Sequence, residues 1–412
     1  MRILGPLLVF SAVIVACGPQ SSTATCDQSN CTGCCTADDQ CVGGTTNSLC
    51  GTGGNQCEVC GSGDVCRDQR CTTVEPRPQA DGGETPDMPD AGHPFEAPLE
   101  TWTWVDFPDA VCGNGAPTGI GVNLTDRSHD LLIFLMGGGA CWDAFTCSFA
   151  ATNVDDGYGA ANFKSEGTLS AAPFDRTIAD NPFKDMSFVF VPYCTGDVHG
   201  GNVVQVYGSG SKARTIHHKG GKNAEIFLQG LRDALPQTSR VFLSGSSAGA
   251  FGAQLQFENA ARIWAGTEVH VVADCGQMIN PSSDLDLLTK WRAAWAMPIP
   301  AGCVGCDTDF TKFPKYMHDK YPSTRFGLLA YEHDGVLTPF FFLDPGTFKE
   351  RTLALAASAY DTTNNAKYFL VKGSSHVMLD ELLTLKGPGD ASLLEWVRQL
   401  VDGDPAWKSI KP

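Results

Sequence analysis

The stretch RVFLSGSSAG, residues 240–249, decides the fold of this chain. Its apolar beginning predicts a buried strand, and the glycine- and alanine-rich residues after Gly249 predict a helix. A strand that enters a helix through Gly-x-Ser-x-Gly is the nucleophile elbow of serine esterases, a turn so sharp that the neighbours of the serine must be small. We therefore predict an α/β fold in which Ser247 is a nucleophile held above the edge of the sheet.

Four histidines follow Ser247, and their positions indicate a general base. In α/β hydrolases the nucleophile, the acid and the histidine follow one another in this order. His270 lies inside a predicted strand and His318 inside a predicted helix, so structural roles are expected for both. His376 follows the predicted strand 367–371 on a polar turn, from which its imidazole could reach Ser247, and we predict that it is the base.

The acid of the triad should follow the strand before that one. The apolar run 326–331 ends in Glu332-His333-Asp334-Gly335, and Asp334 is the first choice. Its carboxylate would accept the Nδ1 proton of His376 and leave Nε2 free for Ser247. Glu332 and Asp274, the latter at the end of the preceding predicted strand, stay open as alternatives.

A run of glycines ends an earlier predicted strand, residues 131–136. Gly137-Gly138-Gly139 lets backbone N–H groups approach a substrate oxygen without a Cβ in the way. We predict that the amides of Gly138, Gly139 and Ala248 form an oxyanion hole, the alternative being an ordinary flexible turn.

Several blocks of sequence carry a resemblance to a known family. The blocks are Cys112–Pro117, Ile133–Trp142, Cys147, Phe190–Asp197, Gly245–Ala250, Ala273–Gly276 and Ser375–His376. With these blocks in this order, the segment from Cys112 to His376 resembles the pectin acetylesterase and Notum family of carboxylesterases. The resemblance implies an α/β-hydrolase fold, a Ser, Asp, His triad and hydrolysis of O-acyl esters, with the nucleophile on Ser247, the base on His376 and oxyanion donors on the glycine run and Ala248. We expect no cofactor.

The resemblance implies that the bond cleaved is an ester bond, but it does not identify the acyl group. Some members of the family remove acetyl groups from pectin, and others remove a longer unsaturated chain from a secreted protein. We expect an O-acetylated glycan as substrate, with longer acyl esters second. The rival hypotheses are a surface binding or adhesion lipoprotein with an inactive hydrolase domain, and a serine peptidase on the same fold.

The first 17 residues predict export. Met1-Arg2 gives a positive start, residues 3–15 are apolar but too short to span a bilayer, and Ile14-Val15-Ala16-Cys17 has the pattern of a bacterial lipobox. Cleavage would leave Cys17 as a lipidated N-terminus that anchors the protein in the bacterial outer membrane or at the cell surface. An ordinary secretory signal with an incidental cysteine is the alternative.

Residues 18–71 form a cysteine-rich module with almost no aliphatic core, so disulfides must hold it together. Ten cysteines lie between residues 26 and 71. Their even number and the export signal favour five bridges over zinc, although Cys31 to Cys34 and Cys57 to Cys60 have C-x-x-C spacing. Residues 72–98 are rich in proline and acidic side chains and predict a linker.

Residues 99–412 are long enough for one large catalytic domain. Predicted strands alternate with helices, which favours a mostly parallel sheet covered on both faces, with the active site at the carboxyl ends of the strands. The predicted strands lie near 131–136, 187–193, 240–245, 268–274, 325–331 and 366–371, and the predicted helices near 223–235, 249–264, 285–296, 349–360 and 391–401.

The domain has an odd number of cysteines. The family pattern suggests bridges between Cys141 and Cys147 and between Cys112 and Cys194, and short spacing suggests one between Cys303 and Cys306. Cys275 remains, and we expect it to be a buried free thiol rather than a second nucleophile.

The formal net charge of −17 argues against nucleic acid and against electrostatic attachment to anionic lipid. Residues 217–222, His-His-Lys-Gly-Gly-Lys, are the one candidate for a basic patch, but we prefer to interpret them as a solvated loop. Asp197 and His199 could line the cleft or stabilise their own loop. No spacing of residues predicts a metal site.

Overall fold

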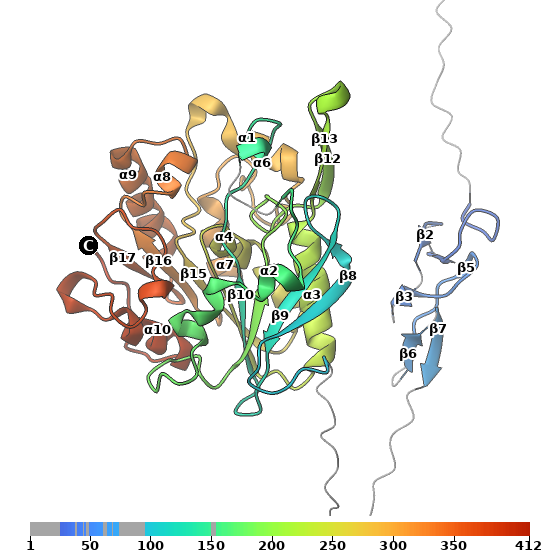
Figure 1. The fold of residues 1–412 in the computed structure, drawn as a ribbon, viewed down its shortest axis with the longest axis horizontal. Coiled ribbons are helices and arrows are strands. Elements are labelled where there is room, and N and C mark those ends of the chain that lie inside the picture. The colour runs from blue at the N-terminus through green and yellow to red at the C-terminus, as the bar shows by residue number, and fades with distance from the viewer. Residues whose placement is uncertain are drawn as a thin grey trace, which may run out of the picture. The chain divides into compact units, whose positions relative to one another are not determined.

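The structure, a computed structural model, describes residues 25–37, 39–43, 45–46, 49–60, 64–67, 69–73, 95–149 and 154–412. The chain divides into two compact units, Met1–Met88 and Pro89–Pro412, and each is described by itself (Figure 1). Cys17 and the rest of the predicted export signal lie outside the described residues. Within the described part of the chain, every helix is too short or too polar to cross a membrane.

The N-terminal unit consists of very short strands held by disulfides. Strand β1 pairs with β2 and β5, β3 pairs with β4, and β6 pairs with β7. All four cysteines of the two C-x-x-C pairs are used in disulfide bonds, so none of them is left as a thiolate for zinc. The strands are β1 (Cys34–Cys35), β2 (Cys41–Val42), β3 (Thr45–Thr46), β4 (Leu49–Cys50), β5 (Asn55–Gln56), β6 (Asp64–Arg67) and β7 (Arg70–Thr73). The bridges are Cys26–Cys35, Cys31–Cys41, Cys34–Cys57 and Cys60–Cys71, and Cys50 is also disulfide-bonded.

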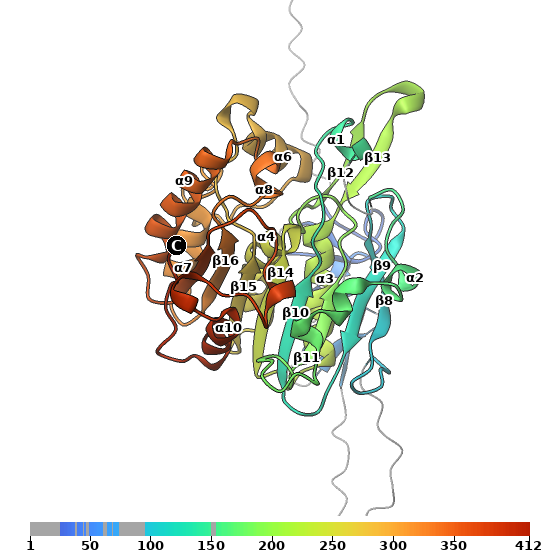
Figure 2. The same ribbon diagram turned by 60° about the vertical axis from the view of Figure 1, so that its left-hand side comes forward.

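The second unit is built on a sheet of eight strands in the order β17-β16-β15-β14-β10-β11-β9-β8 among its described residues (Figures 1 and 2). Strands β10, β11, β14, β15, β16 and β17 run parallel, and β9 and β8 add an antiparallel edge. The mostly parallel α/β sheet that the sequence predicts is therefore confirmed. The strands are β8 (Thr103–Val111), β9 (Pro117–Asn123), β10 (Asp130–Leu135), β11 (Ser187–Val191), β14 (Arg240–Ser246), β15 (Glu268–Asp274), β16 (Phe326–Tyr331) and β17 (Ala366–Val371).

Both faces of this sheet are buried, because alternate residues of each strand enter different cores. In β10, Leu131, Ile133 and Leu135 belong to one apolar cluster, and Leu132 and Phe134 belong to the other. Buried parallel strands read as continuous apolar runs for this reason. The helices of the unit are α1 (Thr146–Phe149), α2 (Ala160–Phe163), α3 (Gly220–Ala234), α4 (Ala248–Leu255), α5 (Phe257–Ile263), α6 (Leu287–Trp295), α7 (Lys312–Lys320), α8 (Leu337–Phe340), α9 (Pro345–Leu355) and α10 (Leu393–Asp402).

The antiparallel edge is the part of the sheet that the sequence did not predict. Strand β8 contains Pro108, which lies where the register with β9 shifts between Phe107 and Val111. Proline is tolerated in sheets at edges and bulges. In β9, a Cβ at Gly119 would lie 2.0 Å from the carbonyl oxygen of Val105, so glycine is needed for the two strands to pair.

Residues 249–264, which the sequence predicts as one continuous helix, form two helices, α4 and α5. The break between them lies at Gln256. The side chain of Gln256 is buried, and its Nε2 donates a hydrogen bond to the carbonyl oxygen of His199.

The loops that follow the parallel strands gather at one end of the unit, together with α1, α6 and α8. The hairpin of β12 (Val203–Tyr207) and β13 (Arg214–His218) projects at the same end (Figures 1 and 2).

Candidate active site

Ser247 lies in a strained turn between β14 and α4. Its φ is 58° and its ψ is −122°, an unusual conformation for a residue with a side chain. The turn is close to the neighbouring strand β10, since a Cβ on Gly249 would lie 1.8 Å from the carbonyl oxygen of Leu135 and one on Gly245 would lie 2.6 Å from it. The two glycines of the elbow are therefore required by close backbone approach. The hydroxyl of Ser247 does not cap α4.

His376 is oriented by Asp334. Its Nδ1 lies 2.8 Å from Oδ2 and 3.0 Å from Oδ1 of that carboxylate, which is fully buried. Asp334 is held in turn, because its Oδ1 accepts hydrogen bonds from the backbone N–H groups of Val336 and Leu337 at 2.9 and 2.8 Å. Nε2 of His376 is buried and has no hydrogen-bond partner within the described chain. The ring therefore presents a free nitrogen.

Ser247 and His376 line the same cavity, of about 330 Å³. Four further segments contribute to its wall: the glycine run after β10, the loop after β11, helix α4, and α8 with the residue before it. The lining residues are Gly138, Gly139, Ala140, Val198, Ser247, Ala248, Phe251, Val336, Leu337, Phe340 and His376. The elbow, the histidine loop and the glycine run, which are far apart in sequence, thus meet at one place.

The backbone of this cavity offers amides beside Ser247. Helix α4 begins at Ala248, and the first N–H groups of a helix have no partner within it. Gly138 has a φ of 152°, in a region where glycine is favoured. A Cβ on Gly137 would lie 2.7 Å from the carbonyl oxygen of Ser246, so the glycine run passes against the elbow itself.

The other candidate carboxylates do not contact His376 by a hydrogen bond. Glu332 is buried and forms an ion pair with Lys349 at 2.9 Å. Asp274 is fully buried and accepts hydrogen bonds from Ser246 and from the backbone that follows His376. Burial raises the pKa of Asp274.

The two histidines expected to be structural lie in the cores. His270, at β15, accepts a hydrogen bond from the backbone N–H of Arg325 at 3.1 Å, and burial lowers its pKa to about 3. His318, on α7, lies 2.9 Å from the carbonyl oxygen of Ala359, and burial lowers its pKa to about 4. Both imidazoles are therefore held neutral.

Asp197 and His199 stabilise the loop after β11. Asp197 is fully buried and accepts hydrogen bonds from Thr195 Oγ1 at 2.6 Å and from the backbone N–H of Gly220 at 2.7 Å. Nε2 of His199 lies 2.9 Å from the carbonyl oxygen of Met136, directly before the glycine run. This loop thereby supports the wall of the cavity, and Val198 between the two residues is part of that wall.

The basic candidate patch at 217–222 is not one surface feature. His218 is buried, Lys219 donates a hydrogen bond to Asn202, and Lys222 pairs with Glu225. The segment forms the end of β13 and the start of α3 rather than a solvated loop.

The seven cysteines of this unit form three disulfide bonds and leave one free thiol. The structure pairs Cys112 with Cys194, Cys141 with Cys147, and Cys303 with Cys306. Cys275 is a buried free thiol, and burial raises its pKa well above the usual range. Its sulfur and polar atoms of Asp334 and His376 all lie within 4.8 Å of one another, so it packs behind the histidine.

The apolar side of the cavity is the part of the site that sequence reasoning missed. Phe251 and Phe340 belong to the lining, and behind them Trp291, Trp295 and Phe341 pack so closely that only about 10 Å³ of space remains. The rings of Trp291 and Phe340 are stacked with centroids 5.1 Å apart. The spacing of these aromatic residues is typical of helices that face a core, so no pattern could mark them as site residues.

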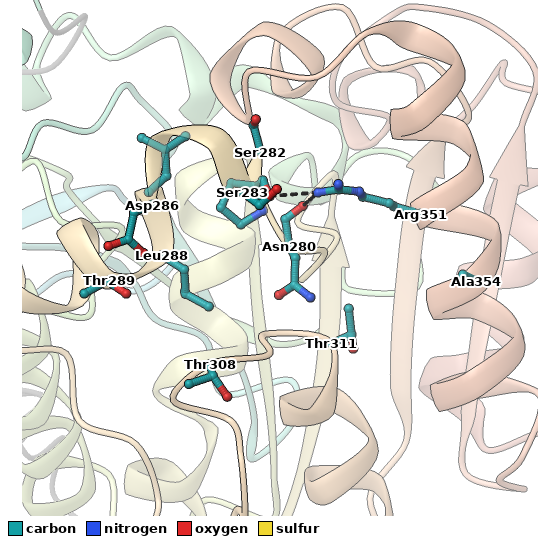
Figure 3. Close-up of a pocket in the computed structure, with 12 residues that line it drawn as sticks. Asn280, Ser282, Ser283, Asp286, Leu288, Thr289, Thr308, Thr311, Arg351 and Ala354 are labelled. Atoms are coloured by element: carbon teal, nitrogen blue, oxygen red, sulfur yellow. Dashed lines mark hydrogen bonds between the residues drawn. The ribbon is translucent and has the colours of Figure 1, made fainter.

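A second, larger cavity of about 570 Å³ lies between the loop after β15 and α9 (Figure 3). Arg351 reaches across from α9, and its Nη1 donates hydrogen bonds to the carbonyl oxygens of Asn280 and Pro281 at 2.6 and 2.7 Å. The hydroxyls of Ser282 and Ser283 also line it. The backbone N–H of Ser282 donates a hydrogen bond to the carbonyl oxygen of Phe341, the residue directly after α8, and α8 itself lines the cavity at Ser247.

Part of this chain, including the cavity at Ser247, is similar to known proteins. The pectinacetylesterase family matches residues 100–372. The palmitoleoyl-protein carboxylesterase notum2 of Xenopus laevis is 30% identical over 206 residues, which is 47% of this chain and 40% of that protein. The palmitoleoyl-protein carboxylesterase NOTUM of Schmidtea mediterranea is 24% identical over 163 residues, 38% of this chain and 30% of that protein. The chain thus spans two fifths or less of the length of these relatives.

A solved structure shows the same fold. The Wnt deacylase Notum from Drosophila superimposes with a TM-score of 0.55 over 75% of this chain and 95% of that one, at 17% sequence identity. At this identity the likeness establishes the α/β-hydrolase architecture alone.

Proposed function

The chain belongs to the pectinacetylesterase family, and from this premise we propose that it is a serine carboxylesterase that hydrolyses O-acyl esters through an acyl-enzyme. One observation carries the proposal. The free Nε2 of His376, whose ring is oriented by the buried Asp334, lies in the lining of the cavity that also contains the elbow serine. This is the constellation needed to activate a hydroxyl as a nucleophile.

In the proposed mechanism His376 Nε2 takes the proton of the Ser247 hydroxyl as Oγ attacks the ester carbonyl carbon. Asp334 accepts the Nδ1 hydrogen bond, fixes the tautomer and stabilises the imidazolium. The amides of Gly138, Gly139 and Ala248 stabilise the oxyanion of the tetrahedral intermediate, and a single such donor contributes about 3 kcal/mol in other enzymes.

Collapse of the intermediate breaks the ester bond, and His376 returns the proton to the leaving alcohol. Water then attacks the acyl carbonyl as His376 takes its proton, the bond to Ser247 Oγ breaks, His376 returns the proton to Oγ, and the carboxylic acid leaves. Every step uses side chains and amides of this chain together with water.

We propose an O-acetyl ester as the first substrate class and a longer acyl chain as the second. The side chains of Val198, Phe251, Leu337 and Phe340 make the cavity apolar beside Ser247, as an acyl group requires. The close packing of Trp291 and Trp295 behind the cavity limits its depth, which supports a short acyl group, while its volume of about 330 Å³ leaves room for a longer chain as the second class. Measuring kcat/KM for a series of nitrophenyl esters with acyl chains of two to ten carbons distinguishes the two substrate classes.

We propose a glycan as the alcohol part of the substrate. The second cavity supports this, because Ser282, Ser283 and Thr289 line it with hydroxyls that have no protein partner in the described part of the chain. Such groups suit a polyhydroxylated ligand. Ser282 in its lining is hydrogen-bonded to Phe341, directly after α8, and α8 borders the cavity at Ser247.

We also propose that the protein is exported and anchored through a lipid on Cys17. The disulfide bonds of both units support an oxidising compartment, where such bonds persist. Mass spectrometry of the mature N-terminus tests the anchor: a diacylated Cys17 supports it, and an unmodified N-terminus downstream of Cys17 contradicts it.

Turnover of nitrophenyl acetate by the full chain and by the Ser247→Ala variant tests the proposed activity. We expect the variant to lose at least 10³-fold in kcat, as loss of a catalytic serine does elsewhere. Equal rates in the two proteins would eliminate the esterase and favour a binding lipoprotein with an inactive hydrolase domain. Faster cleavage of matched amide substrates would favour a peptidase instead.

A further inference from the structure

Asp274 makes hydrogen bonds to both catalytic loops. Its backbone carbonyl oxygen accepts from the N–H of Ser247 at 2.8 Å, and its Oδ2 accepts from Ser246 Oγ at 2.7 Å. On the other side, its Oδ1 accepts from the N–H of Met378 at 2.8 Å and its Oδ2 from the N–H of Leu379 at 3.1 Å. One residue therefore connects the elbow to the segment that follows His376.

The residues next to these hydrogen bonds have strained backbones. Ser247, Cys275 and Val377 have φ values of 58°, 57° and 60°. A positive φ is a true outlier for a β-branched residue such as Val377, and such conformations persist only where the surroundings over-determine them. Ser247 follows Ser246, Cys275 follows Asp274, and Val377 lies between His376 and Met378. Asp274 is thus hydrogen-bonded to two of these strained segments and directly precedes the third.

The carboxylate itself is unusual. It is fully buried, and no Lys or Arg side chain in the described part of the chain forms an ion pair with it. Burying a charge without a counter-charge is costly unless hydrogen bonds compensate, and here three donors do so. Burial raises the pKa of Asp274, while Ser246 and the two amides act to lower it. A neutral side chain of the same size would avoid the cost of burial, so the geometry points to a role that a carboxylate performs.

We propose that Asp274 is a positioning residue that holds the nucleophile Ser247 and the base His376 in one reactive geometry by binding the elbow and the histidine loop together. The inference rests on the proposed function. Asp334 orients the ring of His376 about its own axis, whereas Asp274 sets where the backbone of the histidine loop lies relative to the elbow. Asp274 touches neither the substrate nor the reacting atoms, and its effect is exerted through Ser246, Met378 and Leu379.

The Asp274→Asn variant tests this. Its amide keeps the size of the side chain but turns an N–H₂ group toward one of the donors, which leaves an amide of the histidine loop unpaired. We expect kcat for nitrophenyl acetate to fall about 10- to 100-fold with KM changed less than about threefold, because alignment of reacting groups is lost and substrate binding is not. The matched control is Asp130→Asn, which removes a carboxylate bound to Arg240 at the other end of β14 and should leave kcat unchanged.

The pH profile separates positioning from a general structural effect. Asp274 interacts electrostatically with His376, so removing its charge should move the acid limb of the kcat/KM profile to lower pH. A variant whose only defect was a fraction of unfolded protein would have a lower kcat/KM at all pH values, and the acid limb of its profile would not shift.

Ser246→Ala provides a second test that leaves Asp274 and the loop amides in place. We expect kcat to fall about 3- to 10-fold, and the double variant with Asp274→Asn to be no slower than Asp274→Asn alone, since the two residues act through one connection. Additive losses, or an Asp274→Asn enzyme with unchanged kcat and pH profile, would overturn the inference. If Ser247→Ala retained activity, the proposed function itself would fall, whatever Asp274→Asn showed.

Discussion

At the scale of single residues, the site depends on glycines that allow backbones to touch. Gly249 and Gly245 pack against Leu135 of β10, and Gly137 packs against the carbonyl oxygen of Ser246. None of these positions has room for a side chain. The Gly-x-Ser-x-Gly pattern carries this information in the sequence, which is why the elbow could be predicted. The pattern holds no information on Asp274, whose side chain has hydrogen-bond partners 28 to 105 residues away in sequence.

The Gly249→Ala substitution tests the close approach at the elbow. Its Cβ would meet the backbone of Leu135 at 1.8 Å, which no side-chain rotation can relieve. We expect a loss of about 1–3 kcal/mol in the free energy of unfolding and a fall in kcat, as for overpacked sites. Gly167→Ala is the control, because a Cβ there meets nothing within 4 Å. Urea unfolding followed by tryptophan fluorescence measures both variants, and equal stability of the two would contradict the close packing.

At the scale of elements, the predicted strands β10, β11 and β14 to β17 are present within one or two residues, because buried parallel strands are long apolar runs that few other structures produce. The edge strands β8 and β9 were missed because proline and glycines interrupt them. The pairing of these strands and the packing of Phe340 beside Phe251 depend on contacts between distant segments, which a local pattern does not specify.

The Cys112–Cys194 bridge fastens the antiparallel edge to the end of β11. It joins cysteines 82 residues apart, whereas the Cys303–Cys306 bridge joins cysteines 3 residues apart. Loop-closure entropy predicts that replacing the first pair by alanines lowers the free energy of unfolding by about 4.5 kcal/mol, against about 2 kcal/mol for the second pair. Urea unfolding of the two double variants measures this difference. An equal loss of unfolding free energy in both double variants would show that loop-closure entropy does not determine how much each disulfide bond stabilises the protein.

At the scale of the whole molecule, the stability of the second unit should fall in acid. Burial holds the pKa of His318 at about 4, below its ordinary value of 6.5. Between these pH values the unfolded chain binds more protons than the folded one, so stability is full above pH 6.5 and falls as pH drops toward 4. The expected slope from this residue is at most about 1.4 kcal/mol per pH unit.

The His318→Asn variant should flatten that slope, because it removes the titrating ring and keeps a donor for Ala359. All eight tryptophans lie in the second unit, so their fluorescence reports on its unfolding alone. His270 contributes in the same direction and stays in both proteins. An unchanged dependence of stability on pH in the variant would show that His318 is not held neutral by burial.

In the proposed mechanism, Ser247, His376 and Asp334 act together at one cavity. The experiment that checks this measures the rate at which a fluorophosphonate labels the full chain and locates the modified residue by peptide mass spectrometry. We expect a single label on Ser247, a rate at least 10³-fold lower in His376→Ala, and an intermediate rate in Asp334→Asn. Labelling of Ser247 at an undiminished rate in His376→Ala, or a label on another residue, would contradict it.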